Sequence, residues 1–201
     1  MSPPRRLVLA STSRYRHELL SRLRLPFEVR SPLVDETPHA GEAPAALATR
    51  LALAKAKAVS SNEPEAVVIG SDQVAELDGE SIGKPGTHER AVAQLRRMRG
   101  RSVMFHTAVA VVCEASGFSG SALAPVTVHF RDLSDAEIEH YLRTEQPYDC
   151  AGSAKCETLG IALLAAIDSD DPTTLVGLPL IRTCALLRSA GIDPLMAPAN
   201  S

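Results

Sequence analysis

The sequence predicts an α/β protein in which a mixed, twisted sheet is flanked by helices. Short, continuous apolar runs such as Leu7–Ala10 are typical of strands buried on both faces. Amphipathic helical segments such as residues 45–59 are interspersed with them. A hairpin signal at Asp78-Gly79 and a long β-branched run over residues 103–114 indicate antiparallel pairing, so the sheet is expected to be mixed.

The first half of the chain is divided into elements by apolar spacing and by capping or turn residues. Leucines at helical spacing follow the polar turn Ser11–Ser13, and the free N–H groups at such a helix start suit an anion. Thr87 can cap a helix that Gly100 closes. The predicted order is strand 7–10, helix 14–23, strand 27–30, helix 45–59, strand 66–77 with its hairpin, and helix 87–98.

The second half of the chain continues with strands and two marked helix starts. Ser134 and Glu137 form a capping-box pattern, and Pro179 lies near the start of a last helix that ends before Gly191. The predicted order is strand 103–114, loop 117–124, strand 126–130, a helix after Ser134, loop 150–160, strand 161–167 and the last helix.

Composition limits the compartment and the partners. The 201 residues contain no linker or repeat, so we expect a single domain over residues 1–201, with two lobes around a cleft. The 21 basic and 24 acidic residues argue against binding of DNA or RNA but allow a small phosphorylated ligand. No apolar stretch is long enough for a membrane span or a signal peptide. Four cysteines without zinc-type spacing favour reduced thiols, and we expect a cytoplasmic protein.

Hydroxyl and guanidinium groups gather at the first strand-to-helix turn. Residues 11–16 read Ser-Thr-Ser-Arg-Tyr-Arg. Guanidinium and backbone N–H groups bond phosphate oxygens directly, so the segment suits a triphosphate. A helix cap with solvated arginines is the alternative interpretation of the same residues.

Charged residues at four further positions are candidates for a site. Asp72 follows the buried run Val67–Gly70, which would hold its carboxylate rigidly where a strand emerges. A carboxylate there can hold a metal or take a proton from water, although a turn cap is the alternative. Glu36, Lys55 and Lys84 are weaker candidates, because surface acids are common and a lysine on an apolar helix often extends to solvent.

Taken in order along the chain, these segments resemble the Maf family of nucleotide pyrophosphatases. The resemblance covers about Leu7 to Leu195, and seven motifs in the same order are specific where each alone is weak. The motifs are Leu-Ala-Ser-Thr-Ser-x-x-Arg at 9–16, Val-Asp-Glu at 34–36, Ala-x-x-Lys-Ala at 52–56, Ile-Gly-Ser-Asp-Gln at 69–73, Gly-Lys-Pro at 83–85, Cys-Ala-Gly-Ser at 150–153 and Pro-Thr-Thr-Leu-Val-Gly-Leu-Pro at 172–179.

The resemblance implies an inosine-triphosphatase-like (Maf/Ham) α/β fold with a cleft between two lobes. It also implies a divalent metal cation, Mg or Mn, and hydrolysis of a nucleoside triphosphate to the monophosphate and pyrophosphate. The chain is most similar to the 7-methyl-GTP branch, in Ser-Asp-Gln at 71–73 and in Glu157 downstream of Cys-Ala-Gly-Ser. Three positions depart from the family: Arg14 stands where proline is usual, Tyr15 where this branch usually has tryptophan, and His17 where a second arginine usually follows.

The resemblance implies roles for ten residues of this sequence. The implied catalytic residues are Asp72, Lys55, Lys84 and Glu36, and Glu36 and Asp72 are also the implied metal ligands; the substrate-binding residues are Ser11, Ser13 and Arg16; the specificity residues are Tyr15, Gln73 and Glu157. For Asp72, the resemblance does not decide between a base and a metal ligand.

The base preference also has a chemical argument. Guanine's pairing edge has two donors, which a carboxylate at Glu157 can accept together. Methylation at N7 makes the ring cationic, which favours a nearby carboxylate and stacking on Tyr15, and Gln73 could serve a nearby carbonyl. The alternatives are a dTTP/UTP pyrophosphatase of the same family and a nucleotide-binding regulator of cell division or septum formation. The partner is a small nucleotide, and a homodimer is allowed.

Overall fold

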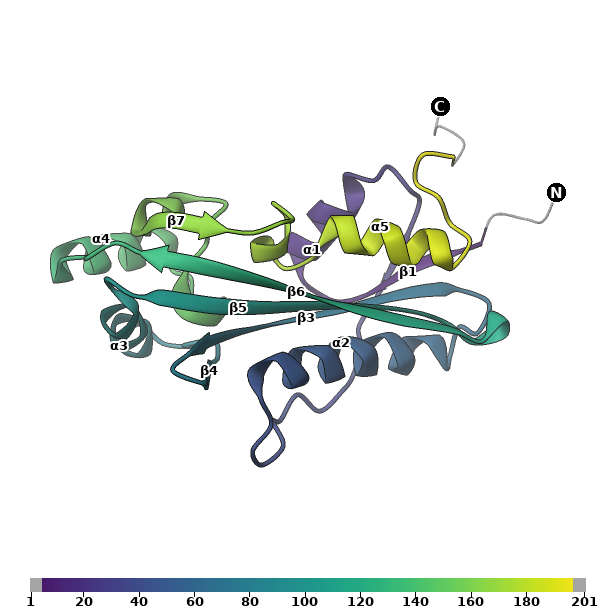
Figure 1. Ribbon diagram of the computed structural model, residues 1–201, viewed down its shortest axis with the longest axis horizontal. Helices are drawn as coiled ribbons and strands as arrows, with labels where there is room; N and C mark the ends of the chain where they lie inside the picture. Colours follow the sequence, from purple (N-terminus) through teal and green to yellow (C-terminus); the bar gives the residue numbers. More distant parts are fainter. Residues whose placement is uncertain (1–4, 197–201) are drawn as a thin grey trace.

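The computed structural model describes residues 5–196 and contains a seven-stranded mixed sheet with helices on both faces (Figure 1). The sheet order is β2-β1-β3-β5-β6-β7, and β4 pairs with β3 off this path. β1 is parallel to β2 and β3, whereas the other pairs are antiparallel. The predicted mixed α/β class is therefore confirmed. The strands are β1 (Leu7–Ala10), β2 (Glu28–Arg30), β3 (Val67–Leu77), β4 (Glu80–Ile82), β5 (Ser102–Cys113), β6 (Phe118–Phe130) and β7 (Leu164–Asp168).

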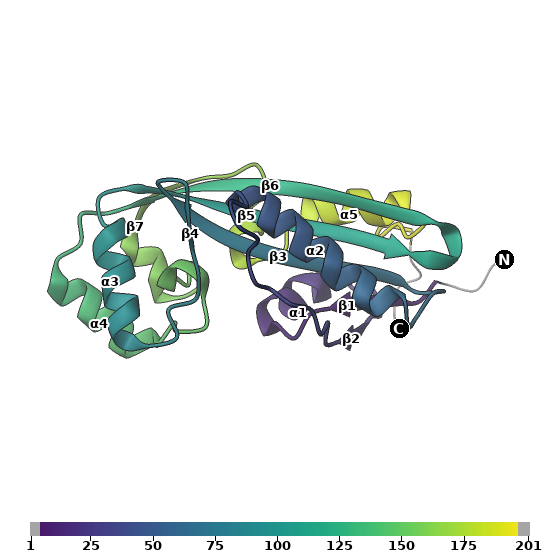
Figure 2. The same ribbon diagram turned by 90° about the horizontal axis from the view of Figure 1, so that it is seen from below.

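The five α-helices of the described chain form two groups at opposite ends of the long strands β3, β5 and β6, and each group with its part of the sheet makes one lobe (Figure 2). In the first lobe, α1 (Arg14–Ser21) and α5 (Leu180–Ser189) lie on one face of the sheet and α2 (Pro44–Ser60) on the other. In the second lobe, α3 (His88–Met98) packs against α4 (Asp135–Glu145). No helix within residues 5–196 is long and apolar enough to cross a membrane.

Capping and turn residues set the ends of several elements as the sequence predicts. The Thr87 hydroxyl accepts the Arg90 N–H at 3.3 Å at the start of α3. Ser134 and Glu137 form a reciprocal capping box on α4. Asp78 and Gly79 both have positive φ, at 58° and 80°, which fits the tight hairpin between β3 and β4.

Two predicted boundaries are wrong. The expected loop 117–124 is in fact the first half of β6, where Ser119 pairs with Val112 and Gly120 with Val111 of β5. The small residues there have weak strand propensity, but pairing along the whole of β5 overrides it. The expected strand 161–167 begins only at Leu164, because a 3₁₀ turn over Leu159–Leu163 precedes it.

The edge of β3 next to β1 has a gap that positions the candidate site. β1 pairs with Val67–Gly70 and β4 pairs with Ala75–Leu77, so no strand of the described chain, residues 5–196, lies beside residues 71–74 on that edge. The turn after β1 arrives at this gap from one side. Because Ile82 pairs with Ala75 in antiparallel register, the turn at Gly83 arrives from the other side.

Side chains of β3 alternate between two environments on either side of the sheet. Val68 and Val74 pack in the cluster beneath α2, whereas Val67 and Ile69 pack in the cluster with α1 and α5. Gly70 faces α2, and a Cβ built there would lie 2.2 Å from the backbone oxygen of Ala52. The missing side chain therefore lets α2 approach β3 closely.

Replacing Gly70 by alanine is expected to destabilise the fold by about 1–3 kcal/mol or more, because backbone atoms of α2 must move to admit a methyl group. The measurement is urea unfolding followed by circular dichroism. Gly83→Ala is the matched control, since a Cβ at Gly83 meets no atom within 4 Å. Equal stability of the two variants would contradict the close packing of α2 on β3.

Candidate active site

A pocket of about 810 Å³ opens at the gap in the edge of β3 and is bounded by both lobes. Its walls come from the turn after β1 and the start of α1, the loop before α2, α2 itself, β3, the turn after β4, the segment after α4 and the loop before α5. All ten residues predicted from the sequence lie in this one pocket: Ser11, Ser13, Tyr15, Arg16, Glu36, Lys55, Asp72, Gln73, Lys84 and Glu157.

An ammonium group between two carboxylates lies at the centre of the pocket wall. Lys55 Nζ is 2.6 Å from Asp72 Oδ1 and 2.7 Å from Glu36 Oε1. The side chains of Lys55 and Asp72 are 7% and 11% exposed, and that of Glu36 is 53% exposed. Buried charges are tolerated when they are paired, and the buried pair here is that of Lys55 with Asp72. Within residues 5–196, Asp72 Oδ2 has no hydrogen-bond partner.

Glu36 is held in its ionised form. Partial burial alone would raise its pKa, but the hydrogen bond from Lys55 and the positive charges of Lys55, Lys84 and Arg16 lower the pKa below its ordinary value of 4.5. Glu36 therefore carries a full negative charge at neutral pH and can bind a cation.

Arg16 is fixed from two sides. Its Nε donates to the Gly177 carbonyl at 2.9 Å, and its Nη1 donates to Ser11 Oγ at 3.5 Å. The Ser13 hydroxyl accepts the Arg16 N–H and caps α1, which sets the direction of the helix start. Burial lowers the pKa of Arg16, and the charges of Asp72 and Glu36 oppose that effect, but an arginine remains protonated at neutral pH. In the described part of the chain, Arg16 Nη2 has no partner.

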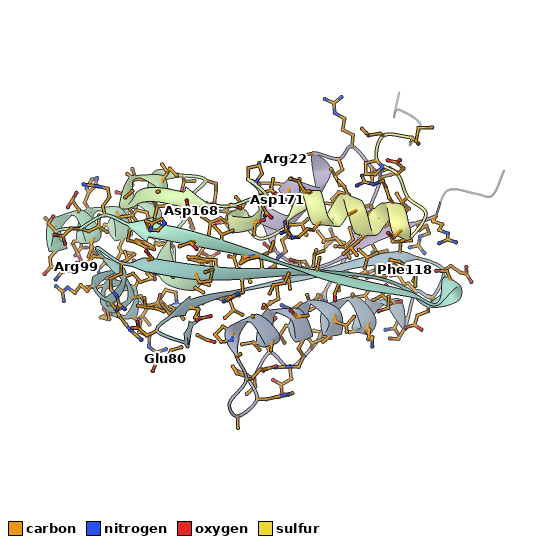
Figure 3. All side chains as sticks on the ribbon, in the orientation of Figure 1. Arg22, Glu80, Arg99, Phe118, Asp168 and Asp171 are labelled. Atoms are coloured by element: carbon orange, nitrogen blue, oxygen red, sulfur yellow. The ribbon has the colours of Figure 1, made fainter. Side chains whose placement is uncertain are left out.

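The Gly177 carbonyl is a support that the sequence interpretation did not identify. It accepts from Ser71 Oγ at 3.0 Å as well as from Arg16, and it lies in the loop before α5. Asp171 holds that loop, because its carboxylate accepts from the Thr173 N–H, the Thr173 hydroxyl and the Ile181 N–H at the start of α5 (Figure 3). An acidic residue two positions before threonine is a local turn signal that could have pointed to this support.

Gln73 uses its donors inside the protein. Its Nε2 lies 2.8 Å from Thr107 Oγ1, 3.2 Å from the Thr174 carbonyl and 3.1 Å from the Leu175 carbonyl. The Thr107 hydroxyl itself donates to the Thr174 carbonyl, so it accepts from Gln73. Only Oε1 of Gln73 remains for a ligand. The carbonyls that the Gln73 amide donates to are thus those of Thr174 and Leu175, and Oε1 is the atom that can accept from an N–H group of a ligand.

Lys84 and Glu157 lie at the solvent-facing part of the pocket. Both are exposed. The turn that carries Lys84 is fixed by the hydrogen bond from Gln94 Nε2 to the Gly83 carbonyl at 3.0 Å. Lys84 forms no ion pair with the residues that the structure describes, so its charge is available to a ligand.

Of the three departures from the family pattern, two line the pocket. Arg14 and Tyr15 contribute to its wall, and they contact each other. His17 instead packs against Phe27, with ring centroids 5.1 Å apart. The change at His17 therefore leaves the pocket wall intact.

The cysteines near the pocket are protonated thiols. Burial and the charge of Asp149 raise the pKa of Cys150 to about 12, and burial and the charge of Glu157 raise the pKa of Cys156 to about 12. All four cysteines are free, as predicted. The thiolate is the reactive form, so the raised pKa values of Cys150 and Cys156 disfavour a role for either as a nucleophile.

The two carboxylates fit a metal site that the substrate completes. Among residues 5–196 no group of three or more His, Cys, Asp or Glu side chains could hold a metal by itself. Glu36 and Asp72 face each other across Lys55 Nζ, and both line the pocket. Mg²⁺ in proteins is commonly bound by one or two carboxylates together with substrate phosphates and water, so this donor set suits it.

Comparison with known proteins identifies the family of the chain. The family model for "Maf-like protein" matches residues 6–190. The chain belongs to the Maf family. Among relatives of this Maf chain, a protein of Polaromonas sp. (strain JS666) is 71% identical over 94% of the chain and 86% of its own length. Proteins of Albidiferax ferrireducens and Thiobacillus denitrificans are 66% and 56% identical over 98% and 96% of the chain and over 100% and 96% of their own lengths.

These three relatives of the Maf chain are named 7-methyl-GTP pyrophosphatase. Among solved structures, the Staphylococcus aureus Ham1 protein aligns with a TM-score of 0.45 and 17% identity, over 64% of this chain and 73% of that one. A Ham1 protein from Coxiella burnetii aligns with a TM-score of 0.42 and 14% identity, over 65% of this chain and 75% of that one.

Replacing Lys55 by methionine in the Maf chain is expected to cost about 3–5 kcal/mol at pH 7, because it leaves the buried carboxylate of Asp72 unpaired, and to raise the pKa of the more exposed Glu36. The wild-type pKa of Glu36 is lowered, so its ionised form stabilises the wild type above its ordinary pKa and this contribution is lost as pH falls. The difference between the proteins should therefore shrink near pH 4.

Urea unfolding at the two pH values measures this difference. Lys57→Met is the control, since Lys57 is on the same helix but exposed. A loss for Lys55→Met that is no larger than that for Lys57→Met, or that does not change with pH, would show that the ammonium does not stabilise the two carboxylates.

Proposed function

We propose that the chain is a cytoplasmic nucleoside-triphosphate pyrophosphatase that hydrolyses 7-methyl-GTP to 7-methyl-GMP and pyrophosphate. The observation that carries the proposal is the convergence of Asp72, Lys55 and Glu36 with the cations of Arg16 and Lys84 in one pocket. Relatives 56–71% identical that bear the name 7-methyl-GTP pyrophosphatase support the choice of substrate.

The triphosphate is bound by the cations on both sides of the gap in β3. Arg16 comes from the turn after β1 and Lys84 from the turn after β4, so they approach the phosphates from opposite lobes. The hydroxyls of Ser11 and Ser13 lie beside Arg16 and orient phosphate oxygens. Fixed cations and donors of this kind stabilise the charge that grows on the leaving pyrophosphate.

Hydrolysis breaks the bond between the α-phosphorus and the oxygen that bridges it to the β-phosphorus. A water oxygen forms the new bond to the α-phosphorus, and pyrophosphate leaves with the bridging oxygen. Asp72 accepts the proton of the water through Oδ2, since Lys55 already engages Oδ1. The proton then passes to solvent, which restores the carboxylate.

Glu36 and Asp72 are the residues that would hold a divalent metal, Mg or Mn. When bound, such an ion would acidify the attacking water and neutralise phosphate charge. Lys55 lines the same pocket and would neutralise the triphosphate together with Arg16 and Lys84.

The base is recognised by acceptors and by an aromatic ring. Glu157 accepts both donors of the guanine pairing edge, and Gln73 Oε1 accepts from any further N–H. Tyr15 offers a ring face for stacking. Uracil and thymine present one N–H between two carbonyl groups, which these acceptors repel.

Replacing Asp72 by asparagine is expected to lower turnover at least about 100-fold, because the amide cannot accept the proton of the attacking water. Steady-state hydrolysis of 7-methyl-GTP, with release of pyrophosphate as the signal, measures the effect. Asp168→Asn makes the same change at an exposed acid that does not line the pocket, and it should stay within a few-fold of wild type. Near-normal turnover of Asp72→Asn would remove Asp72 from the chemistry.

A panel of 7-methyl-GTP, GTP, dTTP, UTP and dITP tests the substrate. The highest kcat/KM is expected for 7-methyl-GTP. The Glu157→Gln variant should lose at least about tenfold of the preference for 7-methyl-GTP over UTP, since a charged bidentate acceptor is replaced by a neutral one.

Two results of the panel would favour the alternatives. Preference for dTTP or UTP would assign the chain to the sister activity of the family. Tight triphosphate binding without release of pyrophosphate from any nucleotide would indicate a regulator. An unchanged preference in Glu157→Gln would refute recognition of the guanine edge by this carboxylate.

A further inference from the structure

The first two residues of α1 form a joined pair at the pocket wall. The guanidinium carbon of Arg14 lies 4.7 Å from the centroid of the Tyr15 ring. Arg14 Nη2 also donates a hydrogen bond to Tyr15 Oη at 2.9 Å. Both residues line the pocket, with Arg14 exposed and Tyr15 half-buried.

The two contacts depend on each other. The hydroxyl of Tyr15 anchors the guanidinium, and the anchored guanidinium lies over the ring, whose faces carry partial negative charge. A phenylalanine at position 15 would keep the ring but lose the anchor. Arg14 is therefore held beside the ring that stacks the base.

The Arg14 guanidinium over the Tyr15 ring changes which bases stack favourably on that ring. The faces of an aromatic ring attract a positive charge, and a second positive charge near the same ring is repelled by the first. Neutral guanine stacks without this repulsion, whereas guanine methylated at N7 is cationic. The acids Asp149 and Glu157 on the pocket wall have the opposite effect and attract the cationic base.

We propose that Arg14 is a specificity-determining residue that reduces the preference of this pocket for the cationic, N7-methylated guanine nucleotide over neutral GTP. The inference rests on the proposed function and deepens it. With Arg14 present, the ratio of kcat/KM for 7-methyl-GTP to that for GTP is smaller than the acids of the pocket alone would produce.

The test compares kcat/KM for 7-methyl-GTP and for GTP in the wild type and in Arg14→Met, which keeps a long apolar side chain without the charge. The ratio of the two values is expected to rise about threefold to tenfold in Arg14→Met, the size of effect for one solvent-exposed charge near another. Tyr15→Phe should raise the ratio by a smaller factor, because Arg14 loses its anchor there.

Salt provides a second readout that a purely structural role of Arg14 would not give. Exposed charges are screened over about 10 Å at 0.1 M salt and over about 3 Å at 1 M salt. The difference in ratio between wild type and Arg14→Met should therefore be largest at low salt and disappear near 1 M. Arg22→Met is the matched control, because Arg22 lies at the other end of α1 (Figure 3) and should leave the ratio unchanged.

The possible contrary results separate this inference from the proposed function. If the wild type hydrolyses both nucleotides and the ratio is unchanged or lower in Arg14→Met, the role of Arg14 is refuted and the pyrophosphatase stands. The same conclusion follows if the ratio rises equally at all salt concentrations. If the wild type hydrolyses neither nucleotide, the proposed function fails, and the role of Arg14 fails with it.

Discussion

The site depends on one buried ammonium group, that of Lys55, which lies between the carboxylates of Asp72 and Glu36. The ammonium is nearly buried and pairs with both acids, so removing it would leave the buried carboxylate of Asp72 without its cation. Lys55 is carried by α2, which packs directly on the backbone of Gly70, two residues before Asp72. A glycine in the middle of a buried strand thus connects the packing of the first lobe to the ion pairs of the pocket.

Strand β3 also divides the pocket into two functional halves. Asp72 faces α2 and pairs there with Lys55. Ser71 and Gln73 face the loop before α5 and donate hydrogen bonds to its carbonyl groups. That loop in turn fixes Arg16 through the Gly177 carbonyl. One strand and one loop therefore position both Arg16 and Gln73 in the pocket wall.

Local patterns predicted the elements whose ends are marked by capping or turn residues, such as the helix after Ser134, and motif order predicted which ten residues share a pocket. Three features could not be predicted because tertiary contacts create them. The strand through Gly120 exists because β5 pairs with it, the donors of Gln73 are consumed by a loop about 100 residues away, and the contact of Arg14 with Tyr15 depends on side-chain direction. Residue spacing along the sequence does not predict hydrogen-bond direction or contacts between side chains.

A crystal structure with Mn²⁺ and a 7-methyl-GTP analogue that carries a methylene group in place of the α–β bridging oxygen would be the most direct measurement. The α-phosphorus should lie beside Asp72 Oδ2, separated by one water that is within hydrogen-bond reach of it, roughly 2.6–3.2 Å. The triphosphate should contact Arg16, Lys55 and Lys84. An analogue bound with its triphosphate outside this pocket, or with the α-phosphorus on the far side from Asp72, would contradict the assignment of the site.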